Sequence, residues 1–153
     1  MGTYGGSGYA LADWNGSSDL TYLPDATLSL LQGSRYAWNS STTDVRALES
    51  PNQSSRKATC WYASSLLMLQ LSFSSAYSGN LELYALDWEP DSRSETVSVN
   101  DGSLAIETAA LTSSFNQGAW MVFPIVVSSG GSVTITVQLT GGANAVLSGI
   151  FLG

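Results

Sequence analysis

The chain has 153 residues, of which only 11% are charged, with twelve acidic side chains against five basic ones. The formal net charge of -7 opposes the phosphate neutralisation on which nucleic-acid binding depends, so we do not expect a nucleic-acid partner. The absence of histidine excludes Ser-His-Asp catalysis, Cys-His catalysis and histidine-ligated zinc. The single cysteine, Cys60, permits no internal disulfide, and we expect a buried, unreactive thiol.

The predicted elements are β-strands, and the first candidate along the chain is the least clear. Residues 23–31 fit a helix that begins near Pro24 as well as they fit an alternating strand. Residues 66–73 and 119–127 are apolar on both faces and are predicted to be central strands, although Pro124 requires an edge or a bulge because it has no N–H to donate.

The clearest strand pattern is strict alternation of apolar and polar side chains. It appears in residues 95–99 and 132–139 and is typical of half-buried antiparallel strands. Reversals rich in Gly, Asn and Ser separate the strands at intervals of roughly ten residues. They lie at residues 78–80, 100–102, 116–118, 128–131 and 141–144. This pattern predicts one all-β domain over residues 1–153, an antiparallel β-sandwich.

The sequence carries no sign of a membrane span or a signal peptide. Its apolar runs are shorter than the ~18 residues that a spanning segment requires, and its first six residues lack the charged and apolar stretches of an export signal. If the protein is exported, we expect its signal to lie outside the printed sequence.

Aromatic side chains are the first candidates for a binding function. The chain has five tryptophans and seven tyrosines, and packing in the core is the default explanation for such rings. The alternative is stacking against the apolar faces of sugars, with nearby polar side chains orienting the hydroxyl groups. Rings near turns are the better candidates for that role.

Trp88 is the best placed of these rings, because it follows a predicted strand and lies in a loop with carboxylates. Asp87 and Arg93 flank it, and both could bond sugar hydroxyls. The alternative is a solvated loop whose shape is fixed by Arg93 pairing with Asp87 or Asp91.

A second cluster combines Tyr36, Trp38 and Asn39 with two charged side chains, Asp44 and Arg46. The rings and the amide are candidate ligand contacts. The charged pair is equally consistent with a buried ion pair that joins the sheets, because burying either charge alone would be costly.

Carboxylates also permit an enzyme hypothesis, since glycoside hydrolysis needs only two of them, ~5 to 9.5 Å apart. Glu82 with Glu95 on neighbouring strands, or Asp87 with Glu89, could form such a pair. We expect Glu82, beside a turn, and Glu95, in an alternating strand, to face solvent instead.

Structural calcium is compatible with an acidic chain rich in oxygen ligands. Asp87, Glu89 and Asp91 are the candidate ligands, with Asp101 in its glycine turn as an alternative. No EF-hand-like spacing is present, and no other cofactor is expected.

Several segments resemble one family of binding domains. Residues 81–88 followed by residues 93–102 resemble the strand, loop and strand of galactose-binding-like β-sandwiches, including malectin-like modules, in which an Arg opens a strand that ends in an Asn/Asp-Gly turn. Residues 141–152 resemble the last strand of the carbohydrate-binding modules of that type in secreted multidomain bacterial proteins. Residues 41–48 and 60–62 fit the same group. The resemblance implies a jelly-roll fold, an extracellular or cell-surface setting and carbohydrate binding without catalysis.

Three hypotheses about function remain open. In the first, the chain is a non-catalytic carbohydrate-binding module that attaches a larger secreted or surface protein to a polysaccharide. Trp88 or Trp38 would then stack on a sugar, with Asp87, Arg93 and Asn39 orienting its hydroxyl groups. In the second, it is a structural or adhesive β-sandwich whose partner is another protein. In the third, it is a small jelly-roll glycoside hydrolase.

Overall fold

The computed structural model describes residues 4–89, 91–103, 105–112 and 114–153, and its regular elements in these ranges are β-strands. None of the described segments is a helix long and apolar enough to cross a membrane. The strands are β1 (Gly8–Leu11), β2 (Leu20–Tyr22), β3 (Ala26–Gln32), β4 (Ser34–Thr42), β5 (Leu48–Glu49), β6 (Arg56–Ala63), β7 (Leu66–Phe73), β8 (Tyr77–Ala85), β9 (Ser94–Asn100), β10 (Glu107–Leu111), β11 (Ala119–Val127), β12 (Ser132–Gly141), β13 (Ala145–Leu147) and β14 (Gly149–Leu152).

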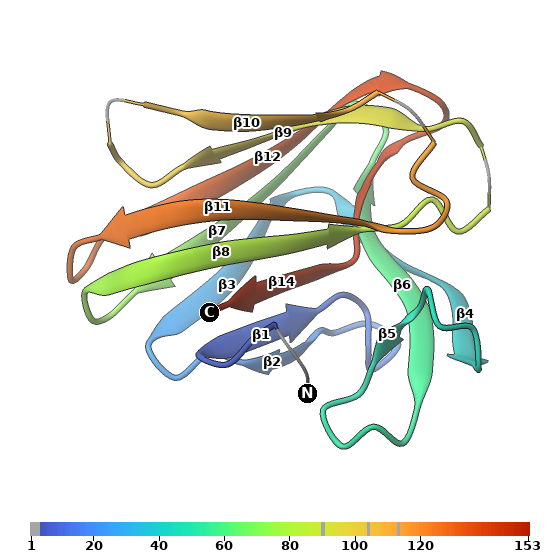
Figure 1. Cartoon of the computed structure of the whole chain (residues 1–153), viewed down its shortest axis with the longest axis horizontal. Helices are drawn as coiled ribbons and strands as arrows, with labels where there is room; N and C mark the ends of the chain where they lie inside the picture. Colours follow the sequence, from blue (N-terminus) through green and yellow to red (C-terminus); the bar gives the residue numbers. More distant parts are fainter. Residues whose placement is uncertain (1–3, 90, 104, 113) are drawn as a thin grey trace.

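Two five-stranded antiparallel sheets pack face to face (Figure 1). Sheet A has the strand order β11-β8-β14-β1-β2, and sheet B has the order β10-β9-β12-β7-β3. The last strand, β14, returns to pair with the first, β1, in sheet A, and β12 pairs with β7 in sheet B. Apart from β2 and β3 at the sheet edges, the strands follow the Greek-key order of a jelly roll. The predicted fold class, an all-β antiparallel sandwich with jelly-roll topology, is confirmed.

The core forms between the two sheets because apolar side chains recur at every second position. In β12 the inward residues are Val133, Ile135 and Val137, each with no exposed surface. They lie in register with Leu71, Leu69 and Leu67 of β7. Burying a side chain of this size contributes about 1.5–3 kcal/mol, so this layer alone strongly favours the observed register.

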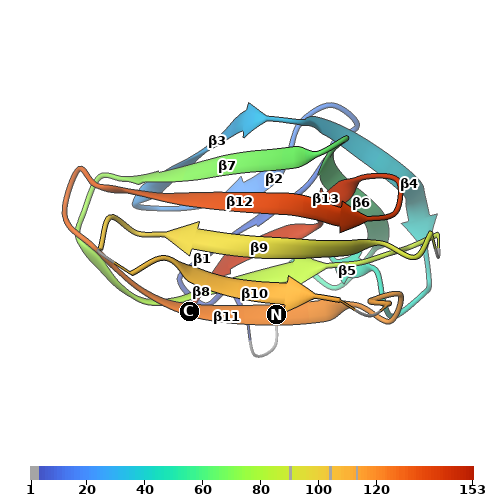
Figure 2. The same ribbon diagram turned by 90° about the horizontal axis from the view of Figure 1, so that it is seen from above.

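A third, smaller sheet lies at one end of the sandwich, with β13-β6-β4 in order and β5 paired to β6 (Figures 1 and 2). A buried carboxylate ties this sheet to the chain just before β2. Asp19 accepts hydrogen bonds from Arg35 of β4 (2.7 and 2.8 Å) and from the indole N–H of Trp61 (3.1 Å). The outward face of this end sheet is therefore held in a fixed position relative to the sandwich.

Two of the sequence predictions are changed or settled by the structure. Most of residues 23–31 belong to strand β3 rather than to a helix. Residues 119–127 were expected to form a central strand, but β11 is the edge of sheet A, and this prediction was wrong. Its outward row is apolar yet exposed, with Val122 at 51% and Val126 at 70% exposure.

Cys60 is buried as expected, at 1% exposure, and burial raises the pKa of its thiol far above the ordinary value.

Candidate functional site

Two strands of the end sheet present an aromatic surface. Tyr36 and Trp38 lie two residues apart on β4, and Tyr62 lies on the neighbouring β6. The Tyr36 ring meets Trp38 edge to face (ring centroids 6.3 Å apart, planes at 84°) and meets Tyr62 in the same way (6.1 Å, 80°). We call these three side chains the aromatic wall. Tyr36 is 50% exposed, so the wall is accessible to a ligand.

Polar side chains from two loops complete a cavity against the aromatic wall. Its volume is about 290 Å³, and Glu89, Arg93 and Asn144 line it together with the wall and Cys60. Arg93 Nε donates to Asn144 Oδ1 (2.9 Å), and Arg93 Nη1 donates to the backbone carbonyl of Glu89 (3.1 Å). The guanidinium carbon lies 5.8 Å from the centroid of the Trp38 ring. We call this space the Arg93 cavity.

The guanidinium of Arg93 is held from behind by a buried carboxylate. Asp87 has no exposed surface and Arg93 only 6%, and Arg93 Nη1 donates to Asp87 Oδ1. The other carboxylate oxygen accepts from the backbone N–H groups of Asp91 and Arg93, at 3.3 Å each. A buried charge is tolerated only when it is paired and hydrogen-bonded. Asp87 therefore positions Arg93 and does not itself reach the cavity.

The structure brings Arg93, which the sequence analysis grouped with Trp88, together with Tyr36 and Trp38 of the second cluster. It places two other candidates elsewhere. Trp88 packs against the cluster around Tyr84, and the guanidinium of Arg46 lies 4.7 Å from its ring centroid. Asn39 accepts the backbone N–H of Ser41 (3.0 Å) and does not line the cavity.

The acidic residues considered for calcium do not converge. Asp87 faces Arg93, and Asp91 accepts the backbone N–H of Ala143 at 3.0 Å. Within the described ranges, no three His, Cys, Asp or Glu side chains come together as a metal-binding group.

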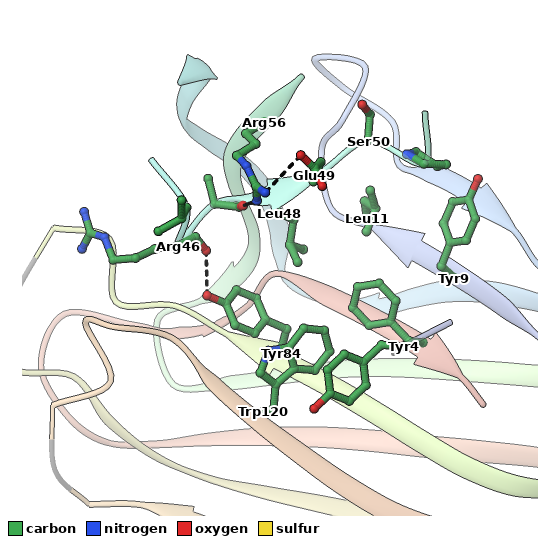
Figure 3. Close-up of a pocket in the computed structure, with 14 residues that line it drawn as sticks. Tyr4, Tyr9, Leu11, Arg46, Leu48, Glu49, Ser50, Arg56, Tyr84 and Trp120 are labelled. Atoms are coloured by element: carbon green, nitrogen blue, oxygen red, sulfur yellow. Dashed lines mark hydrogen bonds and ion pairs between the residues drawn. The ribbon is translucent and has the colours of Figure 1, made fainter. Parts of the chain in front are cut away.

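A second cavity, of about 240 Å³, lies between the outer face of sheet A and the segment around β5 (Figure 3). Tyr84, Trp120 and Tyr4 lie on one side of it, and the ion pair of Arg56 with Glu49 (3.0 Å) lies on the other. We call this space the Trp120 cavity. A hydrogen bond joins two of its lining residues, because Tyr84 donates its hydroxyl to the carbonyl of Arg46 (2.6 Å).

The indole of Trp120 is partly covered by the chain itself. The ring of Tyr4 stacks on it at a centroid distance of 3.9 Å and an interplanar angle of 10°. Tyr84 and Phe151 also contact the indole, at 4.8 and 5.1 Å. Trp120 nevertheless remains 38% exposed, with the ring of Tyr4 over its indole.

The two glutamates of the enzyme hypothesis are far from forming a pair on one surface. Glu82 lies on β8 of sheet A and Glu95 on β9 of sheet B, and both are buried, at 7% and 0% exposure. The expectation that they face solvent from neighbouring strands was wrong. Glu95 shares the parity of Val97 and Val99, so the alternation that buries these valines buries the glutamate as well.

Tyr62 and Asn144 line the Arg93 cavity although the sequence did not single them out as site residues. A partial signal for Tyr62 was its place in residues 60–62, a segment that fits the family resemblance. Which strand it would face depends on the pairing of β4 with β6, which only the tertiary structure gives.

Comparison with known proteins gives fold-level matches among solved structures. TmCBM61, a module solved with β-1,4-galactotriose, has 12% identity and a TM-score of 0.49, with 93% of this chain and 94% of that one covered. A module of Cellvibrio mixtus lichenase 5A, solved with cellotriose, has 12% identity and a TM-score of 0.48, with 95% of each chain covered. A family 35 module from Clostridium thermocellum has 10% identity and a TM-score of 0.43, covering 82% and 88%.

These structures are carbohydrate-binding modules, the class of protein that the sequence resemblance names. The chain matches no protein-family model and no curated protein sequence. At such identities the likeness gives no residue of this chain a role, and the roles proposed below come from its own contacts.

Proposed function

We propose that the protein binds carbohydrate, without catalysis, in the Arg93 cavity. The observation that carries this proposal is the meeting of an open aromatic wall with fixed polar groups in one cavity. Sugar rings have apolar C–H faces that pack on aromatic side chains and hydroxyl groups that both donate and accept. Small-ligand sites characteristically combine apolar walls with a few oriented polar groups.

The polar groups of the Arg93 cavity match both halves of a hydroxyl. Arg93 and the amide of Asn144 supply donors, while the carboxylate of Glu89 supplies acceptors. Arg93 is held by Asp87, by Asn144 and by the Glu89 carbonyl, so little conformational entropy is lost when a ligand binds. The cavity volume is near the lower end of the ~300–1,000 Å³ found for ligand pockets, which suits a chain end or a short stretch of glycan.

The arrangement of carboxylates supports binding rather than hydrolysis. Glycosidases place two carboxyl groups ~5 to 9.5 Å apart on either side of the bond that is cleaved. Glu89 is the only carboxylate among the described residues that line the Arg93 cavity. Asp87 is committed to Arg93, and Glu82 and Glu95 are buried in different sheets.

We extend the proposal to the biological setting that the sequence resemblance implies. The domain would attach a larger extracellular or cell-surface protein to a polysaccharide. Binding at a single small cavity is expected to be weak, in the micromolar to millimolar range, or about -4 to -8 kcal/mol. Weak binding suits a unit whose role is to keep the larger protein close to the polysaccharide.

Replacing Trp38 by alanine tests the proposal. We expect the variant to lose about tenfold in affinity for the saccharides that the wild-type protein binds, because ring stacking contributes about 0.5–1.5 kcal/mol beyond the area it buries. Affinity is measured by titration calorimetry against soluble β-1,4-linked gluco- and galacto-oligosaccharides.

Trp120→Ala is the matched control, because it removes a partly exposed indole from the other cavity. Its saccharide affinity should equal that of the wild-type protein, with thermal unfolding used to show that both variants are folded. Equal losses in the two variants, or a loss only in Trp120→Ala, would remove the assignment to the Arg93 cavity.

A second candidate function is adhesion to a protein, and the outward row of β11 favours it. Trp120, Val122 and Val126 present an exposed apolar strip on the edge of sheet A. The edge itself resists strand addition, because Pro124 has no N–H and the N–H of Val126 is taken by Asp101 (3.1 Å). A protein partner would therefore contact side chains rather than extend the sheet.

A further inference from the structure

The described side chains around the Arg93 cavity carry a net negative charge. Arg93 is neutralised by Asp87, and both groups are at least nine-tenths buried. Glu89 is exposed at the cavity, and its backbone carbonyl accepts from Arg93 Nη1 (3.1 Å), which holds its backbone beside the guanidinium. The described side chains that line the cavity thus carry one carboxylate in excess once the buried pair is counted.

Among the described residues, no basic side chain other than Arg93 lines this cavity. It has five basic side chains in all. Three of the remaining four are in ion pairs, Arg35 with Asp19, Arg46 with Asp44 and Arg56 with Glu49. The fourth, Lys57, donates to the carbonyl of Trp14 (2.6 Å) and lies 5.4 Å from the centroid of that ring. A carboxylate on a bound sugar would therefore meet Glu89 without an unpaired cation to compensate it.

The aromatic wall favours a cation over an anion, as the Glu89 carboxylate does. The faces of indole and phenol rings carry negative partial charge, so they attract a neighbouring cation and disfavour an anion. An ammonium group on a sugar that packs against Tyr36 would meet a ring face of negative partial charge in the same cavity that Glu89 lines.

We propose that the Arg93 cavity selects glycans by charge, binding sugars with a protonated amine better than neutral sugars and neutral sugars better than uronates. This inference rests on the proposed function, because it concerns the ligand of the same cavity. The net charge of -7 adds a long-range preference of the same sign, which salt screens beyond about 8 Å at physiological ionic strength.

The test compares oligosaccharides that share linkage and length and differ in one group per sugar, an ammonium at C2 in the amino sugars and a carboxylate at C6 in the uronates. The gluco series consists of β-1,4-linked tetrasaccharides of glucosamine, glucose and glucuronate, and the galacto series consists of the corresponding galactosamine, galactose and galacturonate compounds. Titrations at about pH 5.5 keep the amines protonated and the uronates ionised. In the series that binds, we expect the amino sugar to bind about two- to tenfold more tightly than the neutral one, and the uronate more weakly.

Glu89→Gln separates the local effect from the long-range one. We expect this variant to lose most of the preference for the amino sugar over the neutral sugar. Glu107→Gln, on the exposed side of β10, changes the net charge by the same amount and should keep the preference.

Three results would overturn the inference. They are a uronate that binds at least as well as its neutral counterpart, an amino sugar with no advantage, and a Glu89→Gln variant with an unchanged preference. If neutral sugars bind and only the ranking differs, the charge selection fails while the proposed function stands. If no saccharide in either series binds, the proposed function fails and the inference fails with it.

Discussion

Replacing Asp87 by asparagine is expected to lower the free energy of unfolding by about 3–5 kcal/mol. The substitution keeps the size of the side chain and removes its charge. Arg93, at 6% exposure, would then retain a buried guanidinium without a counter-charge. Removing one partner of a buried ion pair is strongly destabilising, because the remaining charge stays buried and cannot recover its hydration. This loss is far larger than the net stability that the intact pair adds over a pair of apolar side chains.

Asp44→Asn is the matched control for this prediction. Asp44 also pairs with an arginine, Arg46 (2.8 Å), but the two side chains are 31% and 24% exposed. Pairs of that kind contribute about 0–1 kcal/mol. Urea unfolding followed by tryptophan fluorescence gives both values. Similar losses for Asp87→Asn and Asp44→Asn would mean that burial does not set the strength of the Arg93 pair. Asp87→Asn should also weaken saccharide binding, since Arg93 loses its support.

The stability of the protein is expected to fall by a few kcal/mol as the pH rises from about 4.5 to about 8. Glu95 has no exposed surface, and among the described residues its Oε1 atom has no hydrogen-bond partner. Burial raises its pKa from 4.5 to about 8, although the N–H of Val146 (2.9 Å) and the charge of Arg93 act to lower it.

The sign follows from which state holds the proton. Between these two pH values the unfolded chain releases the proton of Glu95 while the folded protein retains it. Deprotonation thus favours the unfolded state as the pH rises, and the contribution is fully present below about 4.5 and lost above about 8.

The neutral variant Glu95→Gln isolates this effect, because an amide resembles the protonated acid and does not titrate. Urea unfolding at a series of pH values should give a steep decline for the wild-type protein and a much flatter one for the variant. Burial also raises the pKa of Asp13, so the comparison of the two proteins, rather than the wild-type curve alone, assigns the decline to Glu95. Parallel curves would show that Glu95 is not the group responsible.

Much of the fold could be predicted from the sequence because the side-chain period of a strand is two. In residues 132–139 the alternation identifies Val133, Ile135 and Val137 as the inward face, and the structure agrees. The position of a strand within its sheet is not encoded in this way. In residues 119–127 both faces are apolar, yet β11 is an edge strand whose outward row faces solvent. Apolar side chains on two faces do not reveal whether a second layer covers both of them.

The candidate site could be predicted only in pieces. Tyr36, Trp38 and Arg93 were recognisable as rings and a cation near turns, but their meeting depends on how the end sheet lies beside the β8–β9 loop. Asp87 was a candidate ligand contact, with an ion pair to Arg93 as the alternative, and the structure shows the ion pair, buried behind the cavity. Burial of a charged side chain depends on packing between distant segments, which local sequence does not specify.

The most direct test of saccharide binding in the Arg93 cavity is a titration that follows the five indole N–H resonances by NMR. The resonances are assigned with single Trp→Phe variants, and the titrants are neutral gluco- and galacto-oligosaccharides. We expect the Trp38 resonance to shift in a saturable manner, while the resonance of Trp61, which is buried and bonded to Asp19, and that of Trp120 stay in place. A shift of Trp120 without one of Trp38, or no shift of any indole at millimolar saccharide, would contradict the account.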